Sequence, residues 1–251
     1  MLKKIIIMFG LILLNLNLSH AYAFLHVPKT IEIGTTFNGA TLHISGEVPT
    51  GDNVIVEILG TDKQEAFKLK GKVWGIFWMT VGHYEIKGLP SLYLVYLPKS
   101  LSHLSNDKLK NLNFGFEEVY SRFQIEPEPK DKRFIFNEFL KLKQKEKLYG
   151  IVHDSVTYSN ITSQKKKYHA EVMLPPKIMP GIYTIKIYKV SPQFKIDGVD
   201  TDNFKVKLVG FPAFISKMAF EHSLWYGILA VIIAIMAGVL MSALFKGGGA
   251  H

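Results

Sequence analysis

The chain has 251 residues, and its 30 lysine and arginine residues against 21 aspartate and glutamate residues give a formal net charge of +9. It contains no cysteine, which excludes disulfide bonds, thiolate sites for zinc or iron–sulfur clusters, covalently attached c-type haem and a cysteine nucleophile. Hydrophobic residues make up 48% of the chain, and much of this content lies in two blocks at the ends.

The first block, residues 1–23, has the organisation of a secretory signal peptide. Lys3 and Lys4 precede an apolar run, and Ala21 and Ala23 place small residues where a signal peptidase needs them. The run is shorter than the roughly 20 residues that a bilayer span needs, which disfavours the alternative of an uncleaved anchor. We therefore expect export of the chain and cleavage before Phe24.

Residues 24–100 repeat a period-two alternation that is typical of β-strands with one buried face. Leu42 and Ile44 alternate with polar residues, the pattern returns in residues 54–58, and residues 92–97 are apolar on both faces. Short strands at this spacing predict an N-terminal lobe resembling an immunoglobulin-like sandwich.

An aromatic segment, Val73–Val81, stands out within this lobe and predicts a single strand with two apolar faces. One interpretation is a central strand that is buried on both faces. The other is an exposed face that binds a partner, with Trp74, Ile76 and Trp78 as its candidate residues.

Residues 101–150 change to helical spacing and predict a helical insert. A stripe of Ile135, Phe139 and Leu142 indicates the buried face of a helix. We assign a row of lysines to the opposite face and interpret it as solvated, with contact to lipid headgroups or an acidic partner as the alternative. The row is Lys141, Lys143, Lys145 and Lys147.

Residues 151–212 return to the strand pattern and predict a C-terminal β lobe. Pro90–Val95 and Pro180–Ile185 share a Pro-small-aliphatic-Tyr form, and each places a tyrosine at the start of a strand, as in the tyrosine corner of immunoglobulin-like domains. This echo indicates two sandwich-like lobes around the insert. One sandwich interrupted by helices is the alternative.

The second apolar block, Leu224–Phe245, contains 22 residues without a charge. As a helix it would extend about 33 Å, enough to cross the hydrocarbon core of a bilayer. We predict a transmembrane helix over 224–245 and a cytoplasmic tail over 246–251. The signal peptide then places the body on the periplasmic side of the inner membrane, as a single-pass protein.

Small residues recur every four positions along this predicted span, at Ala230, Ala234, Gly238 and Ser242. Such a face lets a second helix approach closely, and in lipid this packing drives helix association. We therefore take these four residues as a candidate helix interface, and a featureless anchor is the alternative.

The sequence offers no candidate for catalysis, and we expect no catalytic residue, metal or cofactor. HExxH, G-x-S-x-G, P-loop and dinucleotide-binding motifs are all absent from the sequence. A site assembled from His43, His83 or His169 is less expected than surface or packing roles. The exported body has 27 basic and 21 acidic residues, and this excess of +6 favours anionic lipid headgroups rather than nucleic acid as a partner.

Several segments, in order along nearly the whole mature chain, resemble a transmembrane protein family described from alphaproteobacteria (Alph_Pro_TM). The matching segments are Ile31–Gly46, Val54–Gly60, Gly75–Trp78, Pro90–Tyr93, Leu148–Tyr149, Pro180–Thr184, Val209–Phe211 and Leu224–Gly227. The resemblance implies a signal peptide, an exported β-rich domain and one span, with no assigned activity. Members are associated with permeases of the sulfite-exporter type, which implies an accessory role at such a transporter.

The leading hypothesis is therefore a non-enzymatic, membrane-anchored accessory protein. Its partner would be a polytopic membrane protein such as a permease, or a second copy of the chain bound through the span. A periplasmic module that binds a small anion or metal is one alternative. An envelope assembly or adhesion protein is another.

Overall fold

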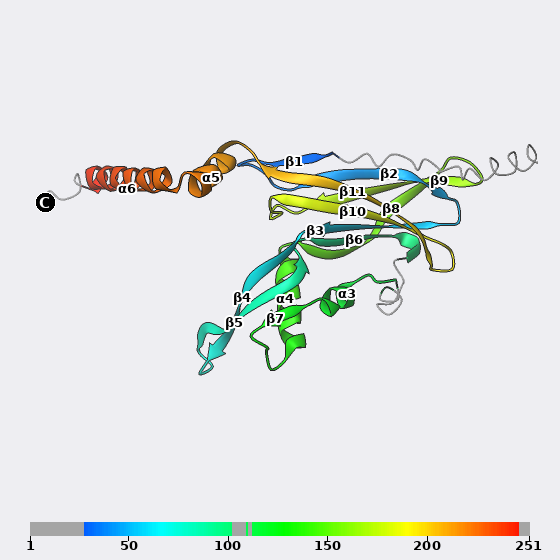
Figure 1. Cartoon of the computed structure of the whole chain (residues 1–251), viewed down its shortest axis with the longest axis horizontal. Helices are drawn as coiled ribbons and strands as arrows, with labels where there is room; N and C mark the ends of the chain where they lie inside the picture. The colour runs from blue at the N-terminus through cyan, green and yellow to red at the C-terminus, as the bar shows by residue number, and fades with distance from the viewer. Residues whose placement is uncertain (1–27, 102–108, 110–111, 246–251) are drawn as a thin grey trace, which may run out of the picture.

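The computed structural model describes residues 28–101, 109 and 112–245. The expected signal peptide (residues 1–23) and cytoplasmic tail (residues 246–251) lie outside the described residues. Two β-sheets, several short helices and a long C-terminal helix that projects from one end make up the described chain (Figure 1). The predicted mainly β class with one C-terminal apolar helix is confirmed.

The larger sheet has eight strands in the order β1-β11-β10-β3-β6-β8-β9-β2. Neighbouring strands are antiparallel except for the parallel pairs β1–β11 and β6–β8. The strands are Thr30–Ile33 (β1), Ala40–Pro49 (β2), Asn53–Gly60 (β3), Tyr93–Pro98 (β6), Tyr149–Asn160 (β8), Lys165–Leu174 (β9), Gly181–Val190 (β10) and Ile196–Leu208 (β11).

Strands from the predicted N-terminal lobe (residues 24–100) and from the predicted C-terminal lobe (residues 151–212) are interleaved within this sheet. β3 lies between β6 and β10, and the edge strand β2 pairs with β9. The two ranges therefore share one sheet, as in the alternative of one β domain interrupted by helices. The immunoglobulin-like topology stays a prediction.

The core follows the period-two pattern of the sequence. Leu42 and Ile44 are buried while Thr41 and His43 between and beside them are exposed, as predicted. At the centre of the sheet, β3 is buried on both faces and β6 is buried along its whole length, which confirms the prediction of a two-sided segment over 92–97. The sheet thus stabilises the fold by burying apolar side chains, without cysteine.

The two echoed tyrosines make different contacts. The Tyr183 hydroxyl donates to the carbonyl of Met179, four residues upstream, at 2.7 Å, which is the tyrosine-corner arrangement. The Tyr93 hydroxyl instead accepts from the amide of Gly115, 22 residues downstream, at 2.9 Å. The tyrosine-corner contact is therefore present at Tyr183 and absent at Tyr93.

The smaller sheet has the order β4-β5-β7 and consists of Asp62–Val73 (β4), Phe77–Pro90 (β5) and Gln124–Glu126 (β7). Among the described residues, the helices are the 3-10 helix η1 (Lys99–Leu101) and the α-helices Phe116–Ser121 (α3), Lys132–Lys145 (α4), Gly210–Glu221 (α5) and Ser223–Phe245 (α6). β7 lies between α3 and α4 in the chain, so the predicted helical range also contributes a strand.

The predicted faces of α4 are partly wrong. Lys143 is only 4% exposed, and it continues the buried stripe of Ile135 and Phe139 at four-residue intervals. Leu142, which the sequence assigned to that stripe, is exposed. Residues two positions apart lie about 200° apart around a helix, so the lysine row cannot form one face.

The hairpin β4–β5 and the C-terminal helices leave the larger sheet at the same end. β3 and β11 are both antiparallel neighbours of β10, so they run in the same direction. β3 continues into β4, and β11 continues into α5 and α6. In Figure 1 the turn of the hairpin therefore reaches the level of α5 along the long axis, on the side toward which α6 projects.

Candidate functional site

The aromatic segment forms the end of a hairpin rather than one strand. β4 ends at Val73, β5 begins at Phe77, and the Ile76 amide donates to the Val73 carbonyl at 3.3 Å across the turn. Trp74 and Gly75 both have positive φ, 52° and 75°. Glycine adopts this conformation at little cost, whereas a tryptophan there is a backbone outlier. The prediction of a single strand over Val73–Val81 is therefore corrected, because a turn divides it.

The end of this hairpin, which we call the hairpin tip (residues 70–81), exposes its apolar side chains. Trp74 is 86% exposed and Trp78 is 68% exposed, and Ile76 is exposed between them. The interpretation of a central strand buried on both faces does not hold. The three candidate partner-binding residues are accessible, together with Phe77, Met79 and Val81.

Lysines adjoin this apolar surface along β4. Lys68, Lys70 and Lys72 are exposed at alternate positions, and the Lys72 Nζ lies 5.6 Å from the ring centroid of Trp78. Between residues 66 and 84 the sequence has three lysines and no acidic residue. The hairpin tip is therefore both aromatic and basic.

The base of the hairpin is held firmly, in contrast to its tip. Phe67 of β4 packs edge-on against Phe139 of α4 with ring centroids 6.0 Å apart. The Lys143 Nζ of α4 lies 2.5 Å from a carboxylate oxygen of Glu65. On the other strand, Ile86 is buried and pairs with β7. These contacts fix the direction in which the tip projects.

The second candidate surface lies on α6. Its 23 residues have no buried side chain and no charge, and it is the one helix among the described residues that is long and apolar enough to cross a membrane. The small-residue face, defined as Ala230, Ala234, Gly238 and Ser242, is exposed throughout. A β-carbon added at Gly238 would meet nothing within 4 Å, so no part of the described chain packs on this face.

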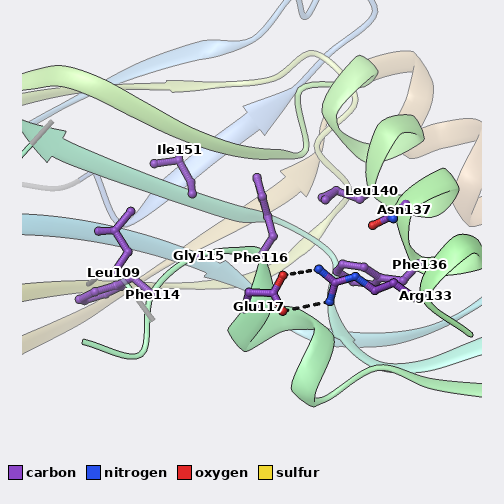
Figure 2. Close-up of a pocket in the computed structure, with 10 residues that line it drawn as sticks. All are labelled: Leu109, Phe114, Gly115, Phe116, Glu117, Arg133, Phe136, Asn137, Leu140 and Ile151. Carbon is purple, nitrogen blue, oxygen red and sulfur yellow. Dashed lines mark hydrogen bonds and ion pairs between the residues drawn. The ribbon is translucent and has the colours of Figure 1, made fainter. Parts of the chain in front are cut away.

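A small pocket lies between α3 and α4, beside β8. Its volume is about 190 Å³, below the roughly 300–1,000 Å³ of typical ligand pockets. Figure 2 shows that the guanidinium of Arg133 faces the carboxylate of Glu117 among phenylalanine and aliphatic side chains. The Arg133 guanidinium is the cation in this pocket that could bind an anion. It is already engaged by the carboxylate of Glu117 and by the Tyr120 ring, whose centroid lies 4.5 Å from the guanidinium carbon.

A buried carboxyl group lies in the larger sheet. Glu57 is 5% exposed and accepts a hydrogen bond of 2.8 Å from the Tyr188 hydroxyl. Burial raises the pKa of Glu57, although the hydrogen bond from Tyr188 acts in the opposite direction. With this partner in place, the buried carboxyl group of Glu57 is not left without a hydrogen bond.

Of the histidines in the larger sheet, His43 and His169 lie at its β2–β9 edge, and His153 lies on β8. His43 stands opposite Glu171, with its Nδ1 3.7 Å from a carboxylate oxygen, and His169 lies on the neighbouring strand. His83 is far along the chain on β5, opposite Lys68. Among the described residues no group of three histidine or acidic side chains could hold a metal ion.

Sequence reasoning missed the basic part of the hairpin tip. Lys68, Lys70 and Lys72 alternate with less polar residues, and this pattern indicates a strand. Gly75 follows shortly afterwards and indicates a turn, since glycine is common where φ must be positive. The tryptophan before it hid the turn, because bulky residues rarely accept that conformation.

The chain matches a known family over nearly all of its length. The model of a family described as "Putative transmembrane protein (Alph_Pro_TM)" covers residues 26–247, which include the β domain, the hairpin tip and α6. No curated protein and no solved structure matches the chain. The chain therefore belongs to the Alph_Pro_TM family of transmembrane proteins.

Proposed function

We propose that this protein is a non-enzymatic accessory subunit of a polytopic membrane protein. α6 anchors it in the inner membrane, the β domain lies on the periplasmic side, and the partner is a permease of the anion-exporter type. The observation that carries the proposal is α6, an apolar helix whose small-residue face meets no other part of the described chain.

The physical reason lies in how helices associate in lipid. Lipid chains are as apolar as leucine, so a hydrophobic surface alone gives α6 no reason to bind another helix. Close approach over alanine, glycine and serine provides packing that a leucine-rich face cannot. Ala230, Ala234 and Gly238 present such a surface over two turns, and the partner's helix would lie against it.

The geometry of the pocket between α3 and α4 supports a protein that acts through a partner rather than one that captures a free anion. Arg133 is paired with Glu117 and stacked near Tyr120, so a small anion would have to displace a bidentate carboxylate. A protein that works through a partner needs no such site of its own. The choice of an anion-exporter-type permease as the partner rests on the association that the family resemblance implies.

Co-purification from membranes in mild detergent tests the proposal. The A234L/G238L variant should lose the permease, because two leucines separate the helix backbones. The matched control M236L/A243L places the same number of substitutions on the opposite side of α6 and should retain it. Equal recovery of the permease with both variants would contradict the proposal, as would recovery of the chain alone in every case.

A titration separates this proposal from anion capture. The purified full chain in detergent, without a permease, should show no calorimetric binding of sulfite at submillimolar concentration. Binding at that concentration, lost in R133Q, would favour the capture function instead.

A further inference from the structure

The hairpin tip carries a surface that the accessory function does not explain. Two tryptophans, a phenylalanine and an isoleucine are exposed around one turn, where a water-soluble hairpin normally carries glycine, asparagine or aspartate. Trp74 also holds a positive φ of 52°. Backbone outliers and exposed apolar clusters both concentrate at binding surfaces, so the tip has the features of a binding surface.

We propose that the hairpin tip inserts into the interfacial region of the lipid leaflet that faces the β domain. It would give the chain a second membrane contact beside α6. The proposal needs only that α6 spans the bilayer, and it holds whether or not the permease partner is correct.

The topology brings the tip to the membrane. Because β3 and β11 run in the same direction, the hairpin and the anchor leave the larger sheet at the same end. Figure 1 shows the tip at the level of α5, from which α6 continues outward. α5 exposes Phe211, Phe214 and Phe220, so two separate elements carry exposed apolar side chains near the point where α6 begins.

The composition of the tip matches lipid more closely than a protein groove. Tryptophan rings favour the membrane–water interface, and lysines extend their apolar stems along it while the ammonium groups reach the headgroups. Lys68, Lys70 and Lys72 supply positive charge, and residues 66–84 of the hairpin contain no acidic side chain. Anionic headgroups attract such a cluster, and the attraction falls off within about 10 Å at moderate salt, so the lysines act only if the tip is at the surface.

The backbone limits the depth of insertion. The hairpin tip pairs β4 with β5 only, and β7 pairs with β5 no nearer the tip than Glu85. Its outer edges therefore carry unpaired amide and carbonyl groups, which are costly in hydrocarbon. The tip can reach the boundary between headgroups and acyl chains, where water still satisfies these groups, and cannot cross.

Because the base of the hairpin is held on α4, insertion of the hairpin tip would also orient the β domain. Phe67 against Phe139 and the Glu65–Lys143 pair tie the base of the hairpin to α4. Insertion at the tip together with α6 would hold the β domain at two points, and would fix which of its sides faces a neighbouring membrane protein.

Tryptophan fluorescence of the full chain tests the proposal, because the chain has three tryptophans. The W225F variant keeps only Trp74 and Trp78 and is reconstituted, without any partner, in vesicles of phosphatidylcholine and phosphatidylglycerol. Brominated phosphatidylcholine should quench most of its emission, and bromines near the headgroup end of the acyl chain should quench more than bromines near the bilayer centre. Emission should also be blue-shifted relative to tryptophan in water.

A matched control moves the reporter to the opposite end of the sheet. In W74F/W78F/W225F/I161W the tryptophan lies in the turn between β8 and β9, and bromine should not affect it. K68Q/K70Q/K72Q in the W225F background should reduce quenching when phosphatidylglycerol is present. Water-like emission from W225F that brominated lipid leaves unchanged would overturn the proposal, and so would stronger quenching from the bilayer centre.

Discussion

Replacing Lys143 by methionine tests how firmly α4 holds the base of the hairpin. The side chain of Lys143 is 5% exposed and its Nζ lies 2.5 Å from Glu65, whose side chain is 28% exposed. Methionine keeps most of the apolar stem but leaves the carboxylate without its partner. Loss of one member costs roughly 3–5 kcal/mol in a fully buried pair and up to about 1 kcal/mol in an exposed one. Since water reaches Glu65 in part, we expect K143M to lower the free energy of unfolding by about 2 kcal/mol, between these two limits.

Urea unfolding of the full chain in detergent, followed by near-ultraviolet circular dichroism of the buried tyrosines, measures this loss. The control K141M removes a lysine that is exposed and paired with Glu138 three residues away, and should cost less than about 0.5 kcal/mol. The double variant E65Q/K143M should recover part of the loss, because the unpaired charge is gone. Equal stability of K143M and K141M would refute the reasoning.

Two further predictions concern the larger sheet. Gly60→Ala should lower the free energy of unfolding by at least about 2 kcal/mol, measured by urea unfolding, because a β-carbon there would lie 2.2 Å from the Ser91 Oγ; wild-type stability would contradict this close approach. Burial raises the pKa of Tyr96 from 10 to about 12. The stability that the protonated Tyr96 contributes to the folded state is therefore fully present below pH 10 and is lost as the pH rises through 12, by up to about 3 kcal/mol. Urea midpoints between pH 9 and 12 should fall less steeply for Y96F than for wild type, and parallel curves would contradict the assignment.

Strand identity was predictable where one face of a strand meets solvent. Residues 40–49 and 165–174 alternate apolar and polar side chains, and this pattern alone locates β2 and β9. Which strands pair was not predictable, because alternation carries no information about neighbours. β3 pairs with β10, more than a hundred residues away in the chain, and only the folded sheet reveals it.

Of the two candidate surfaces, one was predictable from the sequence and the other was not. α6 and its small-residue face follow directly from length, composition and spacing. The hairpin tip did not follow, because periodicity cannot separate a buried strand from an exposed turn when both are apolar. Lys143 illustrates the other failure. Its charge argued for solvent, whereas its helical position, four residues after Phe139, places it beside Glu65.

The central claim is that α6 binds a polytopic membrane protein through its small-residue face. Because the chain has no cysteine, G238C and A243C each introduce a unique thiol on opposite sides of α6, to which a photoactivatable maleimide can be attached in native membranes. Irradiation should link position 238 to a permease, identified by mass spectrometry, and should give no such adduct from position 243. Equal labelling from both positions, or an adduct of two copies of this chain at position 238, would contradict the claim.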